Sequence, residues 1–175
     1  MVVMFMRYRR VYVEGASYFF TVNLAERNSQ LLTEHVGLLR NSFRIVKAAH
    51  PFIIDAIVIM PNHLHTIWTL PVDDSDFSTR WGLIKAGFSR KLPSSERISN
   101  SRRSKGERGI WQPRFWEHLI IDDDDFQHHV DYIHYNPVKH GFVKSVVEWP
   151  YSSFHRYVRL GLLSIDWAGA ESELL

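Results

Sequence analysis

Apolar and polar positions follow two different periods along the chain. Stretches rich in aromatic and β-branched residues predict strands, and these are 17–24, 52–60, 63–70 and 114–121. Stretches with apolar residues near helical spacing predict helices, and these are 33–50, 76–92 and 122–136. Pro61-Asn62 separates the second and third strands, so that pair is expected to form an antiparallel hairpin.

The resulting order is strand, helix, strand, strand, helix, strand, helix. Helices packed over one face of an antiparallel sheet predict an α+β domain of the ferredoxin-like or RRM-like kind. The chain has 175 residues and no internal repeat, so a single domain over residues 1–175 is expected. Within it, the polar, Ser- and Arg-rich stretch near 94–109 predicts a basic mobile loop, and a C-terminal tail is expected from about residue 159.

Capping and breaking residues predict where the helices begin and end. Thr33 is a plausible N-cap for the first helix. Helix 76–92 is expected to be amphipathic, with its basic residues on the exposed side. The acidic run 122–125 suits the positive end of the third helix, and Pro137 is expected to end that helix because it disfavours helical backbone in the residue before it.

Composition excludes several classes of protein. There is no cysteine, so disulfides, thiolate nucleophiles and cysteine-ligated metal centres are absent. No stretch approaches the ~18 apolar residues of a membrane span, and the start "MVVMFMRYRR" has the reverse order of a signal peptide. A cytoplasmic protein without a membrane partner is therefore expected.

Positive charge is unevenly distributed, although the net charge is only +2. Basic residues gather at the N-terminus and between residues 80 and 114, where the only acidic residues are Glu96 and Glu107. Segregated positive charge is typical of proteins that bind polyanions. For residues 94–108, a solvated basic loop with no partner explains the pattern equally well.

Two histidines interrupt the apolar sequence "IVIMPNHLHTIW". His63 and His65 lie two residues apart in a predicted strand, so their side chains share one face of the sheet. Two imidazoles side by side can bind one divalent metal ion, or they can sit half-solvated at a sheet edge.

The third predicted helix carries a tyrosine that could act as a nucleophile. If Phe126, Val130 and Ile133 form the buried stripe, Tyr132 and Asn136 fall together on one flank of it, with His129 beside them, while Tyr135 points away from the core. An asparagine oxygen can ligate a hard cation, and a tyrosine can attack phosphorus when a base or cation assists it. A boundary tyrosine and a cap-like asparagine before proline remain the alternative.

Four motifs in order resemble one family. "MPNHLHTIW", "GIWQPRFWEH", "YIHYNPVKHGFV" and "WPYSSF" are similar to the REP-associated tyrosine transposases, relatives of the single-tyrosine insertion-sequence transposases of the HUH class. The resemblance extends from about Tyr8 to Trp167. It implies a metal-dependent single-stranded DNA endonuclease and strand transferase that acts on REP-type palindromic hairpins through a 5′-phosphotyrosine intermediate.

The resemblance also assigns roles to residues. Tyr132 corresponds to the nucleophile, His63 and His65 to the metal-binding histidines, and Asn136 to a third ligand of Mg²⁺ or Mn²⁺, bound directly or through water. The related insertion-sequence enzymes have Gln at the position of Asn136. A monomer is favoured over a homodimer. The basic residues expected to contact DNA are Arg7, Arg9, Arg10, Arg90, Lys91, Arg102, Arg103, Lys105, Arg108 and Arg114.

Two other functions stay open on the residues alone. A metallohydrolase for small substrates would use the same metal with a water nucleophile, but would leave the basic residues unexplained. A non-catalytic single-strand nucleic-acid-binding module would make His63 and His65 structural. Trp111, Phe115 and Trp116 are interpreted as core aromatics, and either Glu117 or His118 as a support for the metal ligands.

Overall fold

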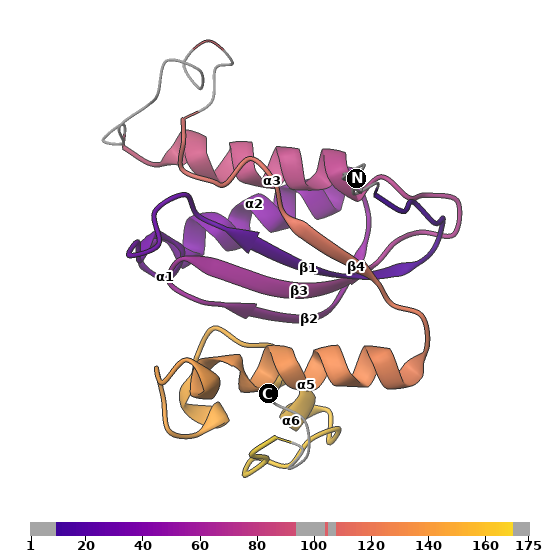
Figure 1. Cartoon of the computed structure of the whole chain (residues 1–175), viewed down its shortest axis with the longest axis vertical. Helices are drawn as coiled ribbons and strands as arrows, with labels where there is room; N and C mark the ends of the chain where they lie inside the picture. Colours follow the sequence, from indigo (N-terminus) through magenta and orange to yellow (C-terminus); the bar gives the residue numbers. More distant parts are fainter. Residues whose placement is uncertain (1–9, 94–103, 105–107, 170–175) are drawn as a thin grey trace, which may run out of the picture.

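Four strands form one antiparallel sheet in the computed structural model, which describes residues 10–93, 104 and 108–169 (Figure 1). The strands are β1 (Ser17–Asn23), β2 (Ile53–Ile59), β3 (His63–Thr69) and β4 (Trp116–Leu119). Their spatial order is β2-β3-β1-β4. The β2-β3 hairpin around Pro61-Asn62 and the α+β ferredoxin-like class are therefore confirmed.

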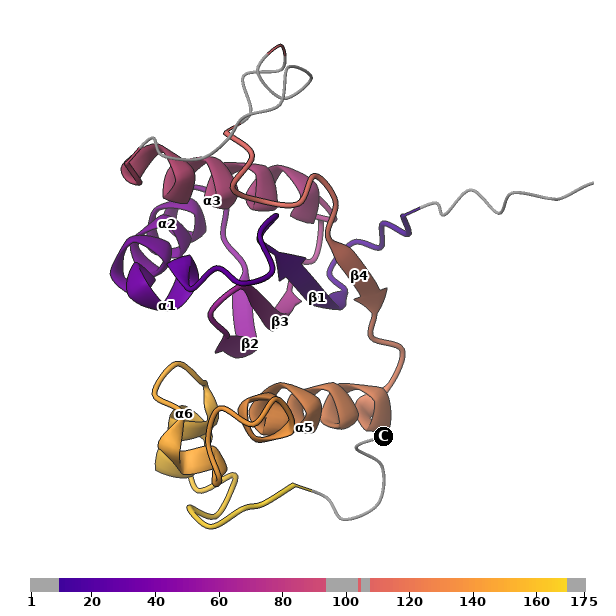
Figure 2. The ribbon, with the colours of Figure 1, turned by 60° about the vertical axis from the view of Figure 1, so that its left-hand side comes forward.

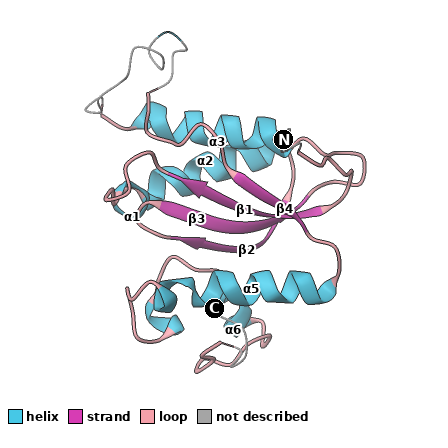
Figure 3. Ribbon diagram, in the orientation of Figure 1, coloured by secondary structure: helices cyan, strands magenta, loops and turns pink. Residues whose placement is uncertain are grey.

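Helices cover both faces of this sheet (Figures 1 and 3). On one side lie α1 (Leu31–Glu34), α2 (Val36–Ala49) and α3 (Phe77–Lys91). On the other side lies α5 (Asp123–Lys139), followed by the short 3-10 helix η1 (Val146–Glu148) and by α6 (Phe154–Arg159). The turned view in Figure 2 shows the same separation, with the sheet between the two groups. None of the described helices is long and apolar enough to cross a membrane.

The expectation that helices cover a single face was wrong, and the strands explain why. In β1, Tyr18, Phe20 and Val22 pack toward α2 and α3, whereas Phe19 packs on the α5 side. A strand that is apolar on both faces needs a cover on both. The larger core lies under α2 and α3, where Trp68 and Trp81 stack with ring centroids 4.2 Å apart.

The predicted helix boundaries differ from the structure at two places. Helix 33–50 is divided at His35, and Thr33 lies inside α1 instead of capping it. Pro137 does not end α5, which continues to Lys139. Gly141, two residues beyond that end, stops the helix: its φ of 72° favours glycine, and its N–H donates to the carbonyl of Val138. Proline removes only one helical hydrogen bond, and packing on both sides of α5 offsets that loss.

One basic residue of α3 is buried, contrary to the expectation that all of them are exposed. Arg80 is only 2% accessible. Its guanidinium donates to both carboxylate oxygens of Asp74, at 3.1 and 2.6 Å, and to the carbonyls of His50, Pro51 and Asp76. A buried cation persists when it is paired and hydrogen-bonded in this way. Arg80 therefore ties the start of α3 to the end of α2.

A C-terminal segment covers the edge of the sheet at β2. Ile59 donates from its backbone N–H to the carbonyl of Tyr151, and Ser153 donates to the carbonyl of Ile57. The same segment contacts the side of α5 that faces away from the sheet, where His134 lies against Ser153, Phe154 and Tyr157. Helix α5 is therefore held between the sheet and residues 151–157.

Candidate active site

His63 and His65 stand on the face of β3 that α5 covers. His65 is buried and His63 is half-buried, and their ring centroids are 5.0 Å apart. The strand register pairs them with Asn23 and Thr21 of β1. The two-residue spacing therefore produces the side-by-side imidazoles that the sequence indicates.

Both imidazoles are oriented through Nδ1. His63 Nδ1 lies 2.7 Å from Asn62 Oδ1, and His65 Nδ1 lies 2.9 Å from the hydroxyl oxygen of Thr21. When Nδ1 donates to these oxygens, the lone pair of each ring is left on Nε2. Metal-binding histidines are commonly fixed by such a hydrogen bond on the second nitrogen.

Burial keeps both histidines neutral. It lowers the pKa of His63 to about 4, with His140 acting in the same direction. It lowers the pKa of His65 to about 3, with further contributions from His63, His140 and Lys139. Because a metal ion binds the unprotonated imidazole, both side chains are ready to act as ligands at neutral pH.

Asn136 supplies a buried amide beside the histidines. The residue is fully buried, and neither Oδ1 nor Nδ2 has a well-formed hydrogen bond to any described residue. A weaker interaction of its side chain with His63 raises the pKa of that ring, against the larger effect of burial. A buried amide without well-formed hydrogen bonds is costly, and a metal ion would satisfy its oxygen. The two imidazoles and this oxygen therefore fit a divalent cation that accepts nitrogen and oxygen ligands.

Tyr132 lies one turn before Asn136 on the same flank of α5. Its ring centroid is 5.2 Å from that of His65 and 5.9 Å from that of Phe19, edge-on in both cases. Val130 and Ile133 are buried in the core on this side, as the helical pattern predicts, and Phe126 packs against it. The structure thus brings together the tyrosine, the histidine pair and the asparagine.

The sequence-based interpretation missed the residues that surround these four. The ring of His140 is 5.4 Å from that of His63, and the ammonium of Lys139 is 5.2 Å from the ring centre of Tyr132. Both lie within about a turn of Asn136, at the end of α5. Lys139 follows Tyr132 and Asn136 at spacings of seven and three residues, so helical spacing could have predicted that it shares their side of the helix. Thr21 and Asn62 could be found only from the strand pairing and the turn.

A second group of possible ligands lies near the first turns of α5. His118 Nε2 is 2.9 Å from Asp125 Oδ2, and His129 Nδ1 is 3.0 Å from Asp125 Oδ1. Ligand atoms of the three residues lie within 4.8 Å of one another. This His/Asp group could also hold a divalent cation. His118 hydrogen-bonds Asp125 and Glu117 pairs with Arg10, so neither of these two contacts orients His63 or His65.

The basic residues expected to bind DNA are not equivalent. Arg90, Lys91 and Arg114 are exposed. Arg10 pairs with Glu117 at 3.4 Å, and the guanidinium of Arg108 donates to the carbonyls of Leu92 and Pro93 at the end of α3. The remaining members of the set lie outside the described residues: Arg7, Arg9, Arg102, Arg103 and Lys105.

The aromatic residues around β4 divide between core and surface. Trp111 is buried, and Phe115 packs against the larger core, as expected. Trp116 is 49% exposed, so its interpretation as a core residue was wrong. It lies on the four-residue edge strand β4, where its ring contacts only the edge of the core through Phe19 and stacks on His118.

A ferredoxin-like sheet that presents a histidine pair opposite a helix tyrosine has the architecture of the tyrosine HUH transposases. The REP-associated tyrosine transposase of Escherichia coli (strain K12) is 52% identical to this chain over 162 residues, 93% of this chain and 90% of the relative. The chain belongs to the family of REP-associated tyrosine transposases.

Two further comparisons agree with this assignment. A Haemophilus influenzae protein of the same family is 45% identical over 163 residues, covering 93% of each chain. A solved structure of a REP-associated tyrosine transposase bound to a REP hairpin matches with a TM-score of 0.83 and 50% identity, covering 96% of this chain and 94% of that one. No family model matches the chain.

Proposed function

We propose that this protein is a metal-dependent single-stranded DNA endonuclease and strand transferase that acts on REP-type palindromic hairpins through a 5′-phosphotyrosine intermediate. The observation that carries the proposal is the position of Tyr132, whose ring lies beside neutral His65 and one turn from the buried amide of Asn136. The solved relative is a REP-associated tyrosine transposase bound to a REP hairpin, which supports the proposed substrate.

His63, His65 and Asn136 would hold one Mg²⁺ or Mn²⁺ ion. Such an ion acts as a Lewis acid on the scissile phosphate. Nitrogen and oxygen donors together suit Mn²⁺ well and Mg²⁺ acceptably. The His118, Asp125 and His129 group lies outside this assignment, because the ring of Tyr132 lies against His65.

Tyr132 would carry out the covalent step. Its phenol oxygen forms a bond to phosphorus while the bond between phosphorus and the 3′ oxygen breaks; the phenol proton leaves, and the 3′ oxygen takes up a proton. One phosphodiester linkage replaces another, so the bond energy is retained and no nucleoside triphosphate is consumed. The ammonium of Lys139, 5.2 Å from the Tyr132 ring centre, offers a cation beside the attacked phosphate.

One copy of the chain supplies every residue of this site. Tyr132 and Asn136 of α5 lie against His63 and His65 of the same molecule. We therefore propose a catalytically complete monomer, as opposed to a dimer that exchanges its tyrosine helix. We expect it to act on chromosomal DNA in the cytoplasm.

The proposal is tested by the covalent adduct. The wild-type protein, incubated with end-labelled hairpin DNA and Mn²⁺, should give an SDS-stable shifted band, and EDTA should abolish it. Tyr132→Phe should lose the band and all cleavage while hairpin affinity stays within about twofold, because only the nucleophilic oxygen is removed. Tyr135→Phe, three residues along the same helix, is the matched control and should keep most activity.

Other outcomes point to the rival functions. Binding without an adduct for every hairpin tried would favour a non-catalytic nucleic-acid-binding module. Metal-dependent hydrolysis of small phosphoesters that survives Tyr132→Phe would favour a metallohydrolase. An adduct lost in Tyr135→Phe and kept in Tyr132→Phe would contradict the assignment of the nucleophile.

A further inference from the structure

Two histidines and an aspartate gather between β4 and the first turns of α5, and the proposed reaction uses none of them. His118 lies on β4, and Asp125 and His129 lie four residues apart on α5. A short connection of residues 120–122 leads from the strand into the helix (Figure 1). All three side chains are half-buried, and their ligand atoms lie within 4.8 Å of one another. We name these three residues the β4–α5 cluster.

The carboxylate of Asp125 lies between the two imidazoles of the cluster. His118 Nε2 is 2.9 Å from Asp125 Oδ2, and His129 Nδ1 is 3.0 Å from Asp125 Oδ1. Two ligands of a tetrahedral Zn²⁺ ion, each bonded at about 2.0–2.1 Å, are about 3.3 Å apart. The two separations in the cluster are only a few tenths of an ångström shorter, so small rotations of the side chains would admit the ion.

Neighbouring groups hold the three side chains in place. Ile121 donates from its backbone N–H to Asp125 Oδ2 at 3.0 Å. His129 Nδ1 also lies 2.8 Å from the backbone carbonyl of Asp125, and the ring of His118 stacks on that of Trp116 with an angle of 10° between the planes. Ligands that are fixed by such contacts before a metal ion arrives lose little freedom when they bind it.

Negative charge surrounds the cluster. Asp122, Asp123 and Asp124 are exposed, and no basic side chain of the described residues forms an ion pair with them. The start of a helix carries a positive charge equivalent to about half an elementary charge, which these three carboxylates outweigh. The field at the start of α5 therefore attracts cations.

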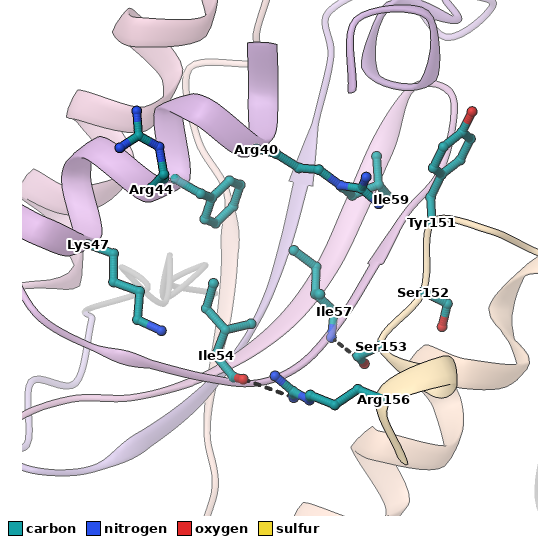
Figure 4. Close-up of a pocket in the computed structure, with 11 residues that line it drawn as sticks. Arg40, Arg44, Lys47, Ile54, Ile57, Ile59, Tyr151, Ser152, Ser153 and Arg156 are labelled. Carbon is teal, nitrogen blue, oxygen red and sulfur yellow. Dashed lines mark hydrogen bonds between the residues drawn. The ribbon is translucent and has the colours of Figure 1, made fainter. Parts of the chain in front are cut away.

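The opposite edge of the sheet has the reverse character. A pocket of about 420 Å³ lies there, between α2, β2 and residues 151–156 (Figure 4). Its lining includes Arg40, Arg44, Lys47 and Arg156, and none of the described residues that line it is acidic. That pocket repels a cation, whereas the edge at β4 attracts one.

The cluster is distinct from the histidine pair of the candidate active site. The buried ring of Phe19 lies against both places, with centroid distances of 4.6 Å to His129 and 5.5 Å to His65. His65 does not belong to the group of ligand atoms that lie within 4.8 Å of one another. The donors differ as well, because the cluster contains a carboxylate where the active site contains the amide of Asn136. An ion in the cluster is therefore a second ion.

We propose that the β4–α5 cluster binds one Zn²⁺ ion, which fastens α5 to β4 ahead of Tyr132. Two imidazoles and a carboxylate, with water as the fourth ligand, are a donor set that zinc accepts. Sites of nitrogen and oxygen ligands bind Zn²⁺ more tightly than Mn²⁺. His129 precedes Tyr132 by three residues, so an ion bound to it holds the helix one turn before the tyrosine.

The alternative for the same contacts is a hydrogen-bonded network without metal. In that network His118 and His129 each donate an N–H to the carboxylate of Asp125. A cation at these nitrogens requires the other tautomer of each ring, with the proton on the second nitrogen. The inference goes beyond the proposed function, because zinc binding does not depend on DNA.

The test counts the Zn²⁺ ions that remain bound after EDTA-treated, desalted protein is dialysed against buffered Zn²⁺. Metal is measured by atomic emission spectroscopy. His63→Ala/His65→Ala removes both imidazoles of the proposed catalytic site and should keep one zinc ion per chain. Adding His118→Ala/His129→Ala to it should remove that ion.

Two further variants in the same background make the test specific. His50→Ala/His128→Ala removes two exposed histidines outside the cluster and should leave the zinc ion bound. Asp125→Asn keeps an oxygen to accept the N–H of Ile121 and removes the charge, so it should weaken zinc binding by more than about tenfold. This single change serves if the histidine variants do not fold, which thermal melting checks.

The fastening of α5 has its own measurement in the His63→Ala/His65→Ala protein. Zinc at about a hundred times its dissociation constant should raise the folding equilibrium constant up to about 100-fold. Hydrogen exchange should slow at the amides of residues 123–132. Bound zinc that changes neither quantity would overturn the fastening of the helix.

The remaining outcomes separate this inference from the proposed function. Equal zinc content with and without the cluster histidines would identify the metal-free network and overturn the inference. Equal losses in His50→Ala/His128→Ala would show adventitious binding to surface histidines, which overturns it too. Wild-type protein that forms no tyrosine adduct would overturn the proposed function and leave the zinc count unchanged.

Discussion

Thr21 and His65 face each other across β1 and β3, with the threonine hydroxyl 2.9 Å from Nδ1 of the imidazole. This contact fixes the ring and leaves Nε2 for a metal ion. Thr21→Val keeps the shape of the side chain and removes the hydroxyl. We expect Mn²⁺ affinity, measured by calorimetry, to fall at least about tenfold, which is the usual cost of losing such a hydrogen bond.

Thr69→Val is the control for that change. Thr69 lies on the same strand as His65, and its hydroxyl contacts Ser17 across the same pair of strands, at 2.6 Å. The variant should leave Mn²⁺ affinity unchanged. Equal losses in the two variants would mean that the strand pairing, and not the orientation of His65, determines metal binding.

The three proposed metal ligands should respond to substitution in different ways. His63→Ala and His65→Ala should each abolish cleavage and weaken Mn²⁺ binding, because each removes one of the two imidazoles that would hold the ion. Asn136→Ala should impair cleavage more mildly, since a water molecule can replace the amide oxygen. Cleavage by the wild-type protein in EDTA would remove the metal from the mechanism.

The buried amide of Asn136, which has no well-formed hydrogen bond to any described residue, leads to a second expectation for that residue. Asn136→Leu replaces this buried polar group by an apolar one of similar size. We expect the metal-free protein to become more stable by about 1 kcal/mol, because the desolvation cost of the amide disappears, while Mn²⁺ affinity falls. Chemical denaturation with and without Mn²⁺ measures both effects, and a loss of stability without metal would show that the amide has partners.

Acid should destabilise the fold through its buried histidines. Burial lowers the pKa of His63, His65 and His134 to about 4, 3 and 4. Between pH 6.5 and 4 the unfolded chain therefore binds protons that the folded protein does not, so the free energy of unfolding should fall as the pH falls. Each histidine contributes a slope of roughly 1.4 kcal/mol per pH unit.

His134 is the best position at which to measure this effect, because it lies on the side of α5 away from the sheet, near Ser153 and Tyr157. His134→Gln should reduce the slope of stability against pH by about the contribution of one proton, measured by denaturant unfolding at pH 5 to 6.5. An unchanged slope would mean that His134 is not neutral in the folded protein.

Arg80 should matter for stability far more than the other basic residues of α3. Arg80→Met leaves Asp74 without its buried partner and the carbonyls of His50 and Pro51 without donors. We expect a loss of roughly 3–5 kcal/mol in the free energy of unfolding. Arg90→Met, on the exposed side of the same helix, should change it by less than about 0.5 kcal/mol.

Features that depend on local backbone periods could be predicted from the sequence, and features that depend on contacts between distant segments could not. The two-residue period placed His63 and His65 on one face, and helical spacing placed Tyr132 with Asn136 and separated it from Tyr135. Those are local regularities of the backbone. Extension of α5 through Pro137 depends on packing from both sides, which no local pattern contains.

The basic pocket between α2, β2 and residues 151–156 was not found from the sequence for a related reason. Arg40 and Arg156 line the same pocket only because residues 151–153 return to pair with β2, whose residues are about a hundred positions earlier in the chain. Runs of neighbouring basic residues are visible in the sequence at 80–114, whereas the basic residues of α2 are separated along the chain and do not form such a run. Burial of Arg80 and the engagement of Arg108 by carbonyls show that such a run includes structural cations.

The position of Tyr132 in the middle of α5 has a consequence for how strands would be exchanged. The helix is held by the sheet on one side and by residues 151–157 on the other. If Tyr132 is the nucleophile, so firmly packed a helix would not carry the attached 5′ end to a distant acceptor. The free 3′ end would instead have to come to the tyrosine, so the folding of the DNA, and not a moving arm of the enzyme, would decide which ends are joined.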